Sequence, residues 1–347
     1  MFNYDDIKNY NRPYVIAEIG ANHNGDIDLA KRMIKVAKEC GADCVKFQSW
    51  SPKSIFSKQV YKDNYFLSDD YRNRSDYTLE SIVEKYSLQK EDQLELKKYC
   101  DINGIDFAST GFCKEEIDFL VDDIEVPFIK VASMDVNNIP FLSYIGKKGK
   151  PVVISTGLCE LSDVIDAIRT LEEAGCRRII ILHCVSIYPP KDEEVNLNNI
   201  DTYKRLFNYP VGYSDHTLGS VASIMSLSYG VCVLEKHFTL DKNMTGWDHK
   251  ISANPDELKM ICESARIGFK MIGSFSKIVS ENEERRNAFQ RSIVAARKIR
   301  KDEIITENDI DYKRPGTGIS PKYYKFLIGK RAKRDIEYDE IINMDDF

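Results

Sequence analysis

The stretch YVIAEIGANHNGDIDLAKRMIKVAKEC, residues 14–40, carries the pattern that decides the fold. Its first part, Tyr14–Gly20, is an apolar run that ends in glycine, and such a run predicts a buried strand. A polar turn over Ala21–Asp26 follows it. Leu29–Cys40 then has the apolar spacing of an amphipathic helix. The stretch therefore predicts one β–α unit.

The same pattern recurs along the chain. Further strands are predicted at Cys44–Gln48, Asp106–Thr110, Phe128–Ser133, Pro151–Thr156, Arg178–Cys184, Val211–His216 and Cys232–His237. Stretches of helical length, such as Ser162–Ala174 and Glu257–Met271, lie between most of them. Eight such units by Ile272 predict an α/β fold, a TIM (β/α)₈ barrel, since one barrel takes about 250 residues. A doubly wound open sheet is the structural alternative.

The 347 residues exceed the length of one barrel. We expect a barrel domain over residues 1–273, with a long insertion at 49–90 that is suitable as a rim or lid. Residues 274–286 are polar and charged and predict a linker. In the remainder, 287–347, residues 295–310 resemble 332–347, which predicts a small β domain with internal pseudo-symmetry.

Composition excludes several classes of protein. Apolar residues make up 43% and charged residues 30% of the chain, which is typical of a globular protein rather than a disordered one. The net charge of -6 argues against a nucleic-acid partner. We find no secretory signal and no apolar run of membrane-spanning length, so we expect no membrane partner. The nine scattered cysteines indicate reduced thiols and a cytoplasmic location.

Polar residues gather at the ends of the predicted strands, where a TIM barrel carries its chemistry. Lys46 and Lys130 alternate with apolar neighbours, and a buried lysine must pair with an anion or lose its charge. One alternative is an internal ion pair with Glu18, Glu235 or Asp215. The other is an anion site in which neutral hydroxyl groups also donate, from Ser133, Ser155 and Ser214.

Two histidines end adjacent predicted strands. His216 and His237 can converge, and imidazoles with a nearby carboxylate suit Mn²⁺, Fe²⁺, Co²⁺ or Zn²⁺. The alternative is that both are hydrogen-bonded histidines without a metal. Glu18 is a candidate general base or acceptor for a sugar hydroxyl, or else a structural partner of Lys46.

These residues belong to motifs of a known family. The chain resembles the sialic acid (N-acetylneuraminate) synthase family, whose members also make related nonulosonic acids. The matching motifs occur in the family's order: Ile16–Gly25, Gly41–Gln48, Ile129–Ser133, Ser155–Gly157, Leu182–Pro189, Gly212–Leu218, Leu234–Thr239 and Lys313–Gly318. Together they span nearly the whole chain.

The resemblance implies a TIM barrel followed by a small β-clip, antifreeze-like (SAF) domain. It implies a domain-swapped homodimer in which that domain caps the partner's barrel. It also implies an enzyme that condenses phosphoenolpyruvate with N-acetylmannosamine or a related N-acylated aldose, giving a nonulosonic acid and phosphate. The implied cofactor is a divalent metal, Mn²⁺, with Mg²⁺ or Co²⁺ as alternatives.

The resemblance also assigns roles to single residues. His216 and His237 would bind the metal, and Arg314 of the other subunit would reach the N-acyl group. Phosphoenolpyruvate would be held by Lys130, Ser133, Ser155 and Ser214, with Lys46 adding positive charge. The sugar would be contacted by Glu18, Gln48, Tyr188 and Asp248. Two positions depart from the family, because Asp135 replaces a glutamate thought to handle protons, and Ser186 replaces an asparagine near the phosphate. Asn73 is a candidate for the family's asparagine in the insertion.

We expect phosphate to leave phosphoenolpyruvate by C–O cleavage, with Glu18 or Asp135 as general base for the attacking water. Lys130 completes the candidate catalytic set. Legionaminic or pseudaminic acid synthesis from a 2,4-diacetamido-trideoxy sugar is the alternative activity. More distant alternatives are another phosphoenolpyruvate-dependent 3-deoxy-sugar-acid synthase, a barrel metal hydrolase and a carbohydrate- or ice-binding protein.

Overall fold

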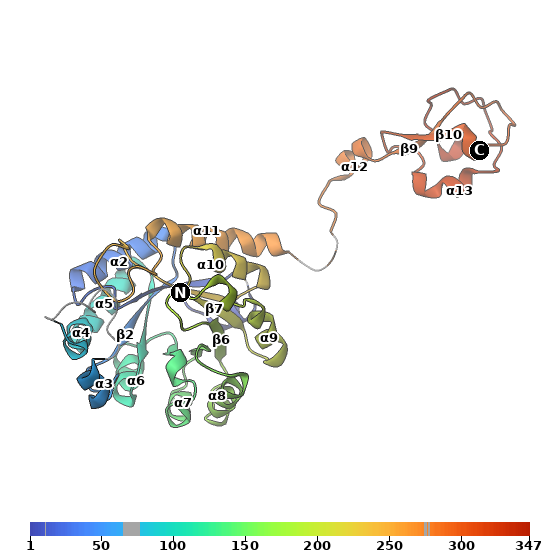
Figure 1. Ribbon diagram of the computed structural model, residues 1–347. Helices are drawn as coiled ribbons and strands as arrows, with labels where there is room; N and C mark the ends of the chain where they lie inside the picture. Colours follow the sequence, from blue (N-terminus) through green and yellow to red (C-terminus); the bar gives the residue numbers. More distant parts are fainter. Residues whose placement is uncertain (11, 65–76, 274–275, 277) are drawn as a thin grey trace. The chain divides into compact units, whose positions relative to one another are not determined.

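The computed structural model describes residues 1–10, 12–64, 77–273, 276 and 278–347. The chain divides into two compact units, Met1–Gly273 and Ser274–Phe347. Figure 1 shows the first as a ring of helices around a set of strands and the second as a small unit with short elements.

The first unit is a closed barrel in which each of eight strands pairs in parallel with the next, and β8 pairs with β1. The strands are β1 (Tyr14–Gly20), β2 (Cys44–Ser49), β3 (Asp106–Gly111), β4 (Ile129–Val131), β5 (Val152–Ser155), β6 (Ile179–Cys184), β7 (Val211–Asp215) and β8 (Val233–His237). The pairing of Tyr14 with Val233 through Glu18 with His237 closes the sheet. The prediction of a TIM-type barrel is therefore confirmed, and the open sheet is excluded.

Helices surround the strands. They are α1 (Tyr4–Lys8), α2 (Ile27–Cys40), α3 (Lys58–Asp63), α4 (Leu79–Tyr86), α5 (Lys90–Asn103), α6 (Lys114–Asp118), α7 (Ile139–Gly146), α8 (Leu161–Glu173), α9 (Asn198–Leu206), α10 (Val221–Ser226) and α11 (Pro255–Ile272). Shorter turns lie at Phe119–Asp123, Ser133–Asp135, Asp192–Glu194 and Leu227–Tyr229. Among the described residues, no helix is both long and apolar enough to cross a membrane.

Local sequence explains how such a unit begins and ends. In α2, the Asp26 side chain accepts hydrogen bonds from the backbone N–H groups of Asp28 and Leu29 and so caps the first turn. The helix ends at Gly41, whose φ of +97° is a left-handed conformation that glycine adopts at low cost. The apolar face of α2 packs against the strands, which fixes the helix on the outside of the barrel.

Five predicted strands are shorter than expected. The fifth lacks Pro151 and Thr156, the sixth lacks Arg178 and the eighth lacks Cys232. The fourth was predicted over Phe128–Ser133, but β4 ends at Val131 because the chain turns into a 3₁₀ helix at Ser133–Asp135. The seventh was predicted to end at His216, but β7 ends at Asp215. His216 therefore lies one residue beyond the strand.

Side chains alternate between the two faces of the barrel wall, as the pleat of a strand requires. Along β8, Val233 lies in the inner apolar cluster and Leu234 in the outer one, against the helices. The inner cluster also contains Tyr4 and Ile7 of α1. The N-terminal segment thus contributes to the apolar filling of the barrel, and the polar residues lie further along the strands.

The insertion at 49–90 contains α3 and α4 and an aromatic cluster. Trp50 lies 5.8 Å from Trp247, ring centroid to ring centroid, and Trp247 lies 6.0 Å from Tyr86. The loop after β8 and the insertion after β2 therefore meet. The candidate Asn73 lies outside the described residues.

The second unit contains α12 (Glu283–Phe289), β9 (Ser292–Ala295), β10 (Ile310–Lys313), α13 (Tyr324–Leu327) and short turns at Glu307–Asp309, Pro321–Tyr323 and Met344–Asp346. Strands β9 and β10 pair antiparallel. The predicted linker 274–286 contains the start of α12, because the Asn282 side chain accepts a hydrogen bond from the Arg285 N–H and caps a helix there.

The internal repeat produces two equivalent ion-pair clusters. Arg297 contacts Asp309 and Glu303, both at 2.7 Å. The second copy, 37 positions later, has Arg334 with Asp346 at 2.7 Å and Glu340 at 2.8 Å. Ile299 and Ile336, the matching positions of the two copies, form a β-bridge with each other. The copies are therefore related in space as well as in sequence.

Candidate active site

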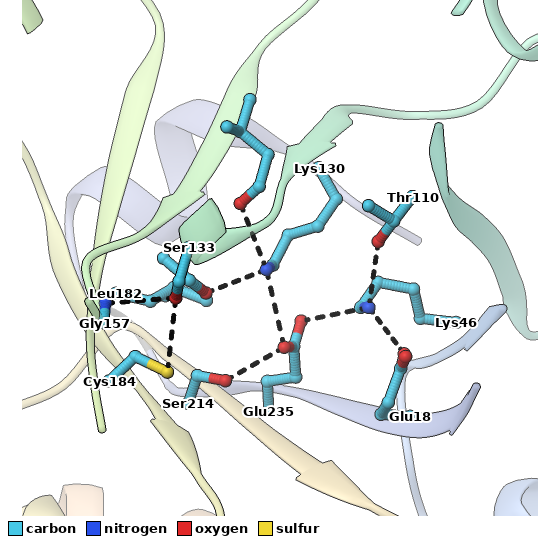
Figure 2. Close-up of polar contacts among 12 residues, drawn as sticks. Glu18, Lys46, Thr110, Lys130, Ser133, Gly157, Leu182, Cys184, Ser214 and Glu235 are labelled. Carbon is cyan, nitrogen blue, oxygen red and sulfur yellow. Dashed lines mark hydrogen bonds and ion pairs between the residues drawn. The ribbon is translucent and has the colours of Figure 1, made fainter. Parts of the chain in front are cut away.

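A layer of polar side chains lies inside the barrel. Along most of the strands, its residue comes two positions after a residue of the inner apolar cluster. The members of the layer come from seven of the eight strands and all are buried: Glu18, Lys46, Thr110, Lys130, Ser155, Ser214 and Glu235. Figure 2 shows that the side chains of the six that it labels point toward one another: Glu18, Lys46, Thr110, Lys130, Ser214 and Glu235. They lie toward the carboxyl ends of the strands, the face where TIM barrels carry their chemistry.

Two lysines and two carboxylates alternate in this layer. Lys46 Nζ lies 2.6 Å from Glu18 Oε2 and 3.8 Å from Glu235 Oε2. Lys130 Nζ lies 3.6 Å from Glu235 Oε1. Both lysines thus form internal ion pairs, which was one of the two alternatives predicted from the sequence. Asp215, the third carboxylate named there, pairs with Lys236 instead. The four charges sum to zero, and Glu235 lies between the two ammonium groups (Figure 2).

Hydroxyl groups complete the coordination of these charges. Lys130 donates to Ser155 Oγ at 2.8 Å and Lys46 to Thr110 Oγ1 at 3.2 Å. Ser214 donates to Glu235 Oε1 at 3.0 Å. Glu235 Oε2 is buried and has no hydrogen bond among the described residues. The layer therefore presents neutral donors beside the lysines and one carboxylate oxygen that is only partly satisfied.

Burial and charge act on these groups in opposite directions. Burial raises the pKa of Glu18 to about 7, against the lowering effect of Lys46 and with a further raising effect from Glu235. For Glu235, burial also disfavours the charged form, but Lys130 and Lys46 outweigh it and lower its pKa. Glu235 is thus the carboxylate of the layer that stays ionised, and Glu18 exchanges a proton near neutral pH.

A second group of predicted residues meets at the loops after β4, β5 and β6. The Gly157 N–H donates to Ser133 Oγ at 3.0 Å, and Ser133 Oγ lies 3.7 Å from Cys184 Sγ. A Cβ atom at Gly157 would lie 2.3 Å from Ser186 Oγ and 2.9 Å from Ser133 Oγ. Only glycine fits at this position, so the hydroxyls of Ser133 and Ser186 both lie close to the Gly157 backbone.

The two candidate metal ligands converge. The rings of His216 and His237 lie 5.4 Å apart, and the Tyr188 ring lies 4.2 Å from that of His216. His216 Nδ1 lies 2.7 Å from the Val185 carbonyl oxygen, which can only accept a hydrogen bond, so Nδ1 carries a proton and Nε2 is the ring nitrogen left to bind a metal. The Asp248 carboxylate lies 3.6 Å from His237 Nδ1.

This donor set fits an open metal site. His237 Nδ1 is buried without a hydrogen-bond partner among the described residues. Burial lowers the pKa of His237 well below its ordinary value, and His216 and the nearby lysines lower it further, so the ring is neutral. Within the described residues, no group of three or more histidine, cysteine or acidic side chains is arranged to hold a metal. Any metal here would have two imidazole ligands and would take its other ligands from water or substrate.

Three further predicted site residues lie at different places: Gln48 beside the buried layer, Asp135 in a turn after β4 and Arg314 in the second unit. Gln48 contacts the layer, because its amide donates to Glu18 Oε1 at 3.2 Å. Asp135 lies in the 3₁₀ turn after β4, where it accepts a hydrogen bond from Asn138 and where burial raises its pKa. Arg314 belongs to the second unit, where its guanidinium lies 5.2 Å from the Phe289 ring.

Sequence reasoning missed two members of the layer as site residues. Glu235 entered it only as an ion-pair partner, and Thr110 only as the end of a strand. Counting alternate positions back from His237 would have placed Glu235 on the inner face. The same counting places His183 on the outer wall, where its Nε2 lies 2.7 Å from the Val195 carbonyl oxygen. His249 is also structural, since its Nδ1 lies 2.7 Å from Thr239 Oγ1.

Comparison with known proteins identifies the family to which this architecture belongs. Residues 33–277 match the model of the NeuB family, and residues 290–347 match the SAF domain. The chain belongs to the NeuB family.

Named relatives agree over nearly the full length. The chain is 39% identical to the N,N'-diacetyllegionaminic acid synthase of Campylobacter jejuni, covering 94% of this chain and 98% of the relative. It is 36% identical to the human N-acetylneuraminate-9-phosphate synthase, covering 95% and 91%. Among solved structures, the N-acetylneuraminic acid synthetase of Leptospira borgpetersenii matches with a TM-score of 0.70 and 30% identity, over 80% of this chain and 90% of that one.

These findings confirm the main expectations from sequence. NeuB-family enzymes condense phosphoenolpyruvate with an amino sugar, so the chain is a transferase-type condensing enzyme of nonulosonic acid biosynthesis. The resemblance to sialic acid synthases and the barrel with a C-terminal SAF domain are confirmed as well. A non-enzymatic carbohydrate-binding role is not supported.

Proposed function

We propose that this NeuB-family enzyme condenses phosphoenolpyruvate with N-acetylmannosamine or a related N-acylated aldose. C3 of phosphoenolpyruvate bonds to the aldehyde carbon, a water oxygen adds to C2, and the C2–O bond to phosphate breaks. The observation that carries the proposal is the buried lysine–carboxylate layer with its hydroxyl groups, next to two converging imidazoles.

The charged layer needs a further cation before it can bind an anionic substrate. When Glu18 is ionised, Lys46 and Lys130 are balanced by Glu18 and Glu235, so the carboxylate and phosphate of phosphoenolpyruvate would enter a cluster of no net charge. Desolvating those groups is costly without a further cation. A divalent metal at the histidines and a guanidinium at the barrel mouth are the cations that we propose.

His216 and His237 would hold the metal, for which Mn²⁺ is our first choice and Mg²⁺ or Co²⁺ the alternatives. Bound there, it would supply Lewis acidity to the aldehyde oxygen. Asp248 and Tyr188 lie beside these histidines and would orient the sugar. Ser133, Ser155, Ser186 and Ser214 would donate hydrogen bonds to the phosphate and carboxylate.

Of the two candidate bases, Glu18 is the better supported. Its pKa of about 7 suits a general base near neutral pH, and it faces the lysines directly. Asp135 accepts a hydrogen bond from Asn138, and among the described residues it forms no ion pair with Lys46 or Lys130. Glu18 would accept a proton from the water that attacks C2.

A homodimer would complete the site. The loops after β4, β5, β6 and β7 each expose an apolar side chain at the barrel mouth: Met134, Leu158, Ile187 and Leu218, exposed by 55%, 74%, 48% and 58%. Exposed apolar side chains on four consecutive loops would suit a protein interface. Arg314 is exposed and has no ion pair within the described part of the chain, so it is available to a partner. We propose that Arg314 of one subunit reaches the N-acyl group bound in the other.

Complementation tests the shared site. Arg314→Ala should mainly raise the KM for the aldose, and His216→Ala should abolish turnover. At an aldose concentration too low for the Arg314→Ala protein to turn over, a co-refolded mixture of the two variants should regain about a quarter of wild-type activity. Half of the dimers are mixed, and each mixed dimer carries one site with both residues intact. If the mixture stays as inactive as its components, Arg314 does not act in the partner's site.

The acyl sugar itself has two candidates. N-Acetylmannosamine is the main one. A 2,4-diacetamido-trideoxy sugar, giving legionaminic or pseudaminic acid, is the second, favoured by the identity to the C. jejuni legionaminic acid synthase. Trp50 and Tyr86 of the aromatic cluster are buried, but Trp247 is only partly buried and is the residue against which we propose that a second acetamido group packs.

An aldose panel distinguishes these substrates. The protein is incubated with phosphoenolpyruvate, Mn²⁺ and one aldose at a time: N-acetylmannosamine, its 6-phosphate, the 2,4-diacetamido-trideoxy sugars or an unacylated aldose phosphate. Phosphate release is followed in each case. We expect release that depends on one of the acylated aldoses. Release without any aldose would indicate a hydrolase, and release only with unacylated phosphosugars would indicate another 3-deoxy-sugar-acid synthase.

A cytoplasmic location also remains our proposal. All nine cysteines are free, as expected in a reducing compartment, and phosphoenolpyruvate is a substrate of that compartment.

A further inference from the structure

A second buried ion pair lies in the outer wall of the barrel, behind the two histidines. Lys236 Nζ lies 3.0 Å from Asp215 Oδ2, and the two side chains are 1% and 0% exposed. The residues are register partners on β8 and β7. Because side chains alternate, their neighbours Ser214 and Glu235 face the barrel interior, and the pair itself faces the helices.

The ion pair holds the residue that follows His216. Asp215 Oδ1 accepts a hydrogen bond from the Thr217 N–H at 2.8 Å, and Lys236 Nζ donates to the Thr217 carbonyl oxygen at 2.5 Å. Both backbone polar groups of Thr217 are thus bound by the pair. Ser223 of α10 donates to Asp215 Oδ2 at 2.6 Å and ties the carboxylate to the helix layer.

This arrangement matters because the sheet does not position His216. Strand β7 ends at Asp215, and the last register pair of β7 with β8 is Asp215 with Lys236. His237, by contrast, lies within β8 and is in register with Glu18 of β1. The backbone at His216 is therefore fixed on one side by the anchored Asp215 and on the other by the bound Thr217.

Stability alone does not account for such a pair. Desolvating two charges is expensive, and replacing a buried ion pair by apolar residues of similar size is often neutral or stabilising. Its attested use is to specify one conformation among alternatives. The conformation specified here is that of the chain immediately after β7.

We propose that Lys236 and Asp215 are positioning residues that hold His216 at the distance and angle from His237 at which the two imidazoles bind one metal ion. The inference rests on the proposed metal role of these histidines. Lys236 and Asp215 face away from the barrel interior and touch neither substrate nor metal; they act through the backbone of His216 and Thr217.

The test measures binding of the metal alone. Lys236→Met with Asp215→Asn removes both charges together and leaves no unpaired charge in the wall. Affinity for Mn²⁺ is measured by titration with detection of free Mn²⁺ by electron paramagnetic resonance, and the visible spectrum of the Co²⁺ form reports ligand geometry. Ile154→Ala is the matched control, since Ile154 also lies in the outer wall, on β5, and its loss destabilises the barrel far from the histidines.

We expect the double variant to bind Mn²⁺ at least about 10-fold more weakly than wild type and to show an altered Co²⁺ spectrum, as loss of supporting groups around metal ligands generally does. Ile154→Ala should keep the wild-type affinity and spectrum while lowering the unfolding midpoint. Wild-type affinity and spectrum in the double variant would overturn the positioning role alone. If the His216→Ala variant binds Mn²⁺ as tightly as wild type, the metal assignment itself is overturned, and the positioning role with it.

Where the double variant fails to fold, Lys236→Arg decides the question. Arginine keeps the charge and the donor to the Thr217 carbonyl, so it should restore binding to within a few-fold of wild type. A folded Lys236→Arg protein with Mn²⁺ affinity as weak as that of His216→Ala would contradict the proposal.

Discussion

Replacing His237 by alanine is expected to lower kcat/KM by at least about a thousandfold, equivalent to roughly 4 kcal/mol of transition-state stabilisation. His237 is one of only two imidazoles at the centre, and its buried Nδ1 has no hydrogen-bond partner among the described residues. Removing it leaves one protein ligand, which does not hold a divalent ion at micromolar concentration. Chelator-treated wild type should recover on addition of Mn²⁺, and the variant should not.

His183→Gln is the control for this prediction. His183 is also buried, but it lies on the outer wall and its Nε2 contacts the Val195 carbonyl oxygen. Its replacement should change the unfolding midpoint and leave the response to Mn²⁺ as in wild type. A His237→Ala protein that remains fully active after chelator treatment would remove the metal from the reaction.

Glu18→Gln is expected to lower kcat by about 10²- to 10⁴-fold, the usual contribution of a general base. Glutamine keeps the size of the side chain and its contact with Gln48, but it cannot accept a proton. Lys46 keeps Glu235 as a second partner at 3.8 Å, so the variant should remain folded.

The pH profile separates this role from simple packing. The groups facing Glu18 are Lys46 of β2, Lys130 of β4 and Glu235 of β8, and burial among them raises its pKa to about 7. A raised pKa leaves Glu18 mostly protonated at pH 6 and mostly ionised at pH 8. The kcat/KM of wild type should therefore rise through this window with the slope of one proton and then level off.

Two variants show which carboxylate produces that rise. Asp135→Asn should retain it, because Asp135 belongs to a turn outside the layer. Glu18→Gln should lose it. The reverse result, with the rise lost in Asp135→Asn and kept in Glu18→Gln, would assign the base to Asp135.

Much of this centre could be predicted because it follows from strand alternation. The apolar runs locate the strands, and Lys46 and Lys130 are single charged residues within such runs, so their burial was foreseeable. The convergence of His216 and His237 also follows, since consecutive strands of a parallel barrel are neighbours. The burial of the lysines and the convergence of the histidines follow from the local sequence pattern and from the barrel fold.

Other features depend on strand ends and on close approaches that the sequence does not show. In Glu235-Lys236-His237, three polar residues in a row do not by themselves show which faces the interior; Glu235 can be placed there only once His237 is taken to point inward. The shortening of β7 by one residue is equally hidden, yet it creates the need for the Lys236–Asp215 pair. Gly157 was quoted only as part of a motif, and its close approach to two serine hydroxyls became visible only in three dimensions.

The central claim is that phosphoenolpyruvate reacts with an acylated aldose and loses phosphate by C–O cleavage. It is tested most directly with phosphoenolpyruvate that carries ¹⁸O at the oxygen bridging C2 and phosphorus. In the presence of the productive aldose and Mn²⁺, mass spectrometry should find the label in the released phosphate and the oxygen of solvent water in the nonulosonic acid. Label retained in the organic product, or phosphate released at the same rate without an aldose, would contradict the claim.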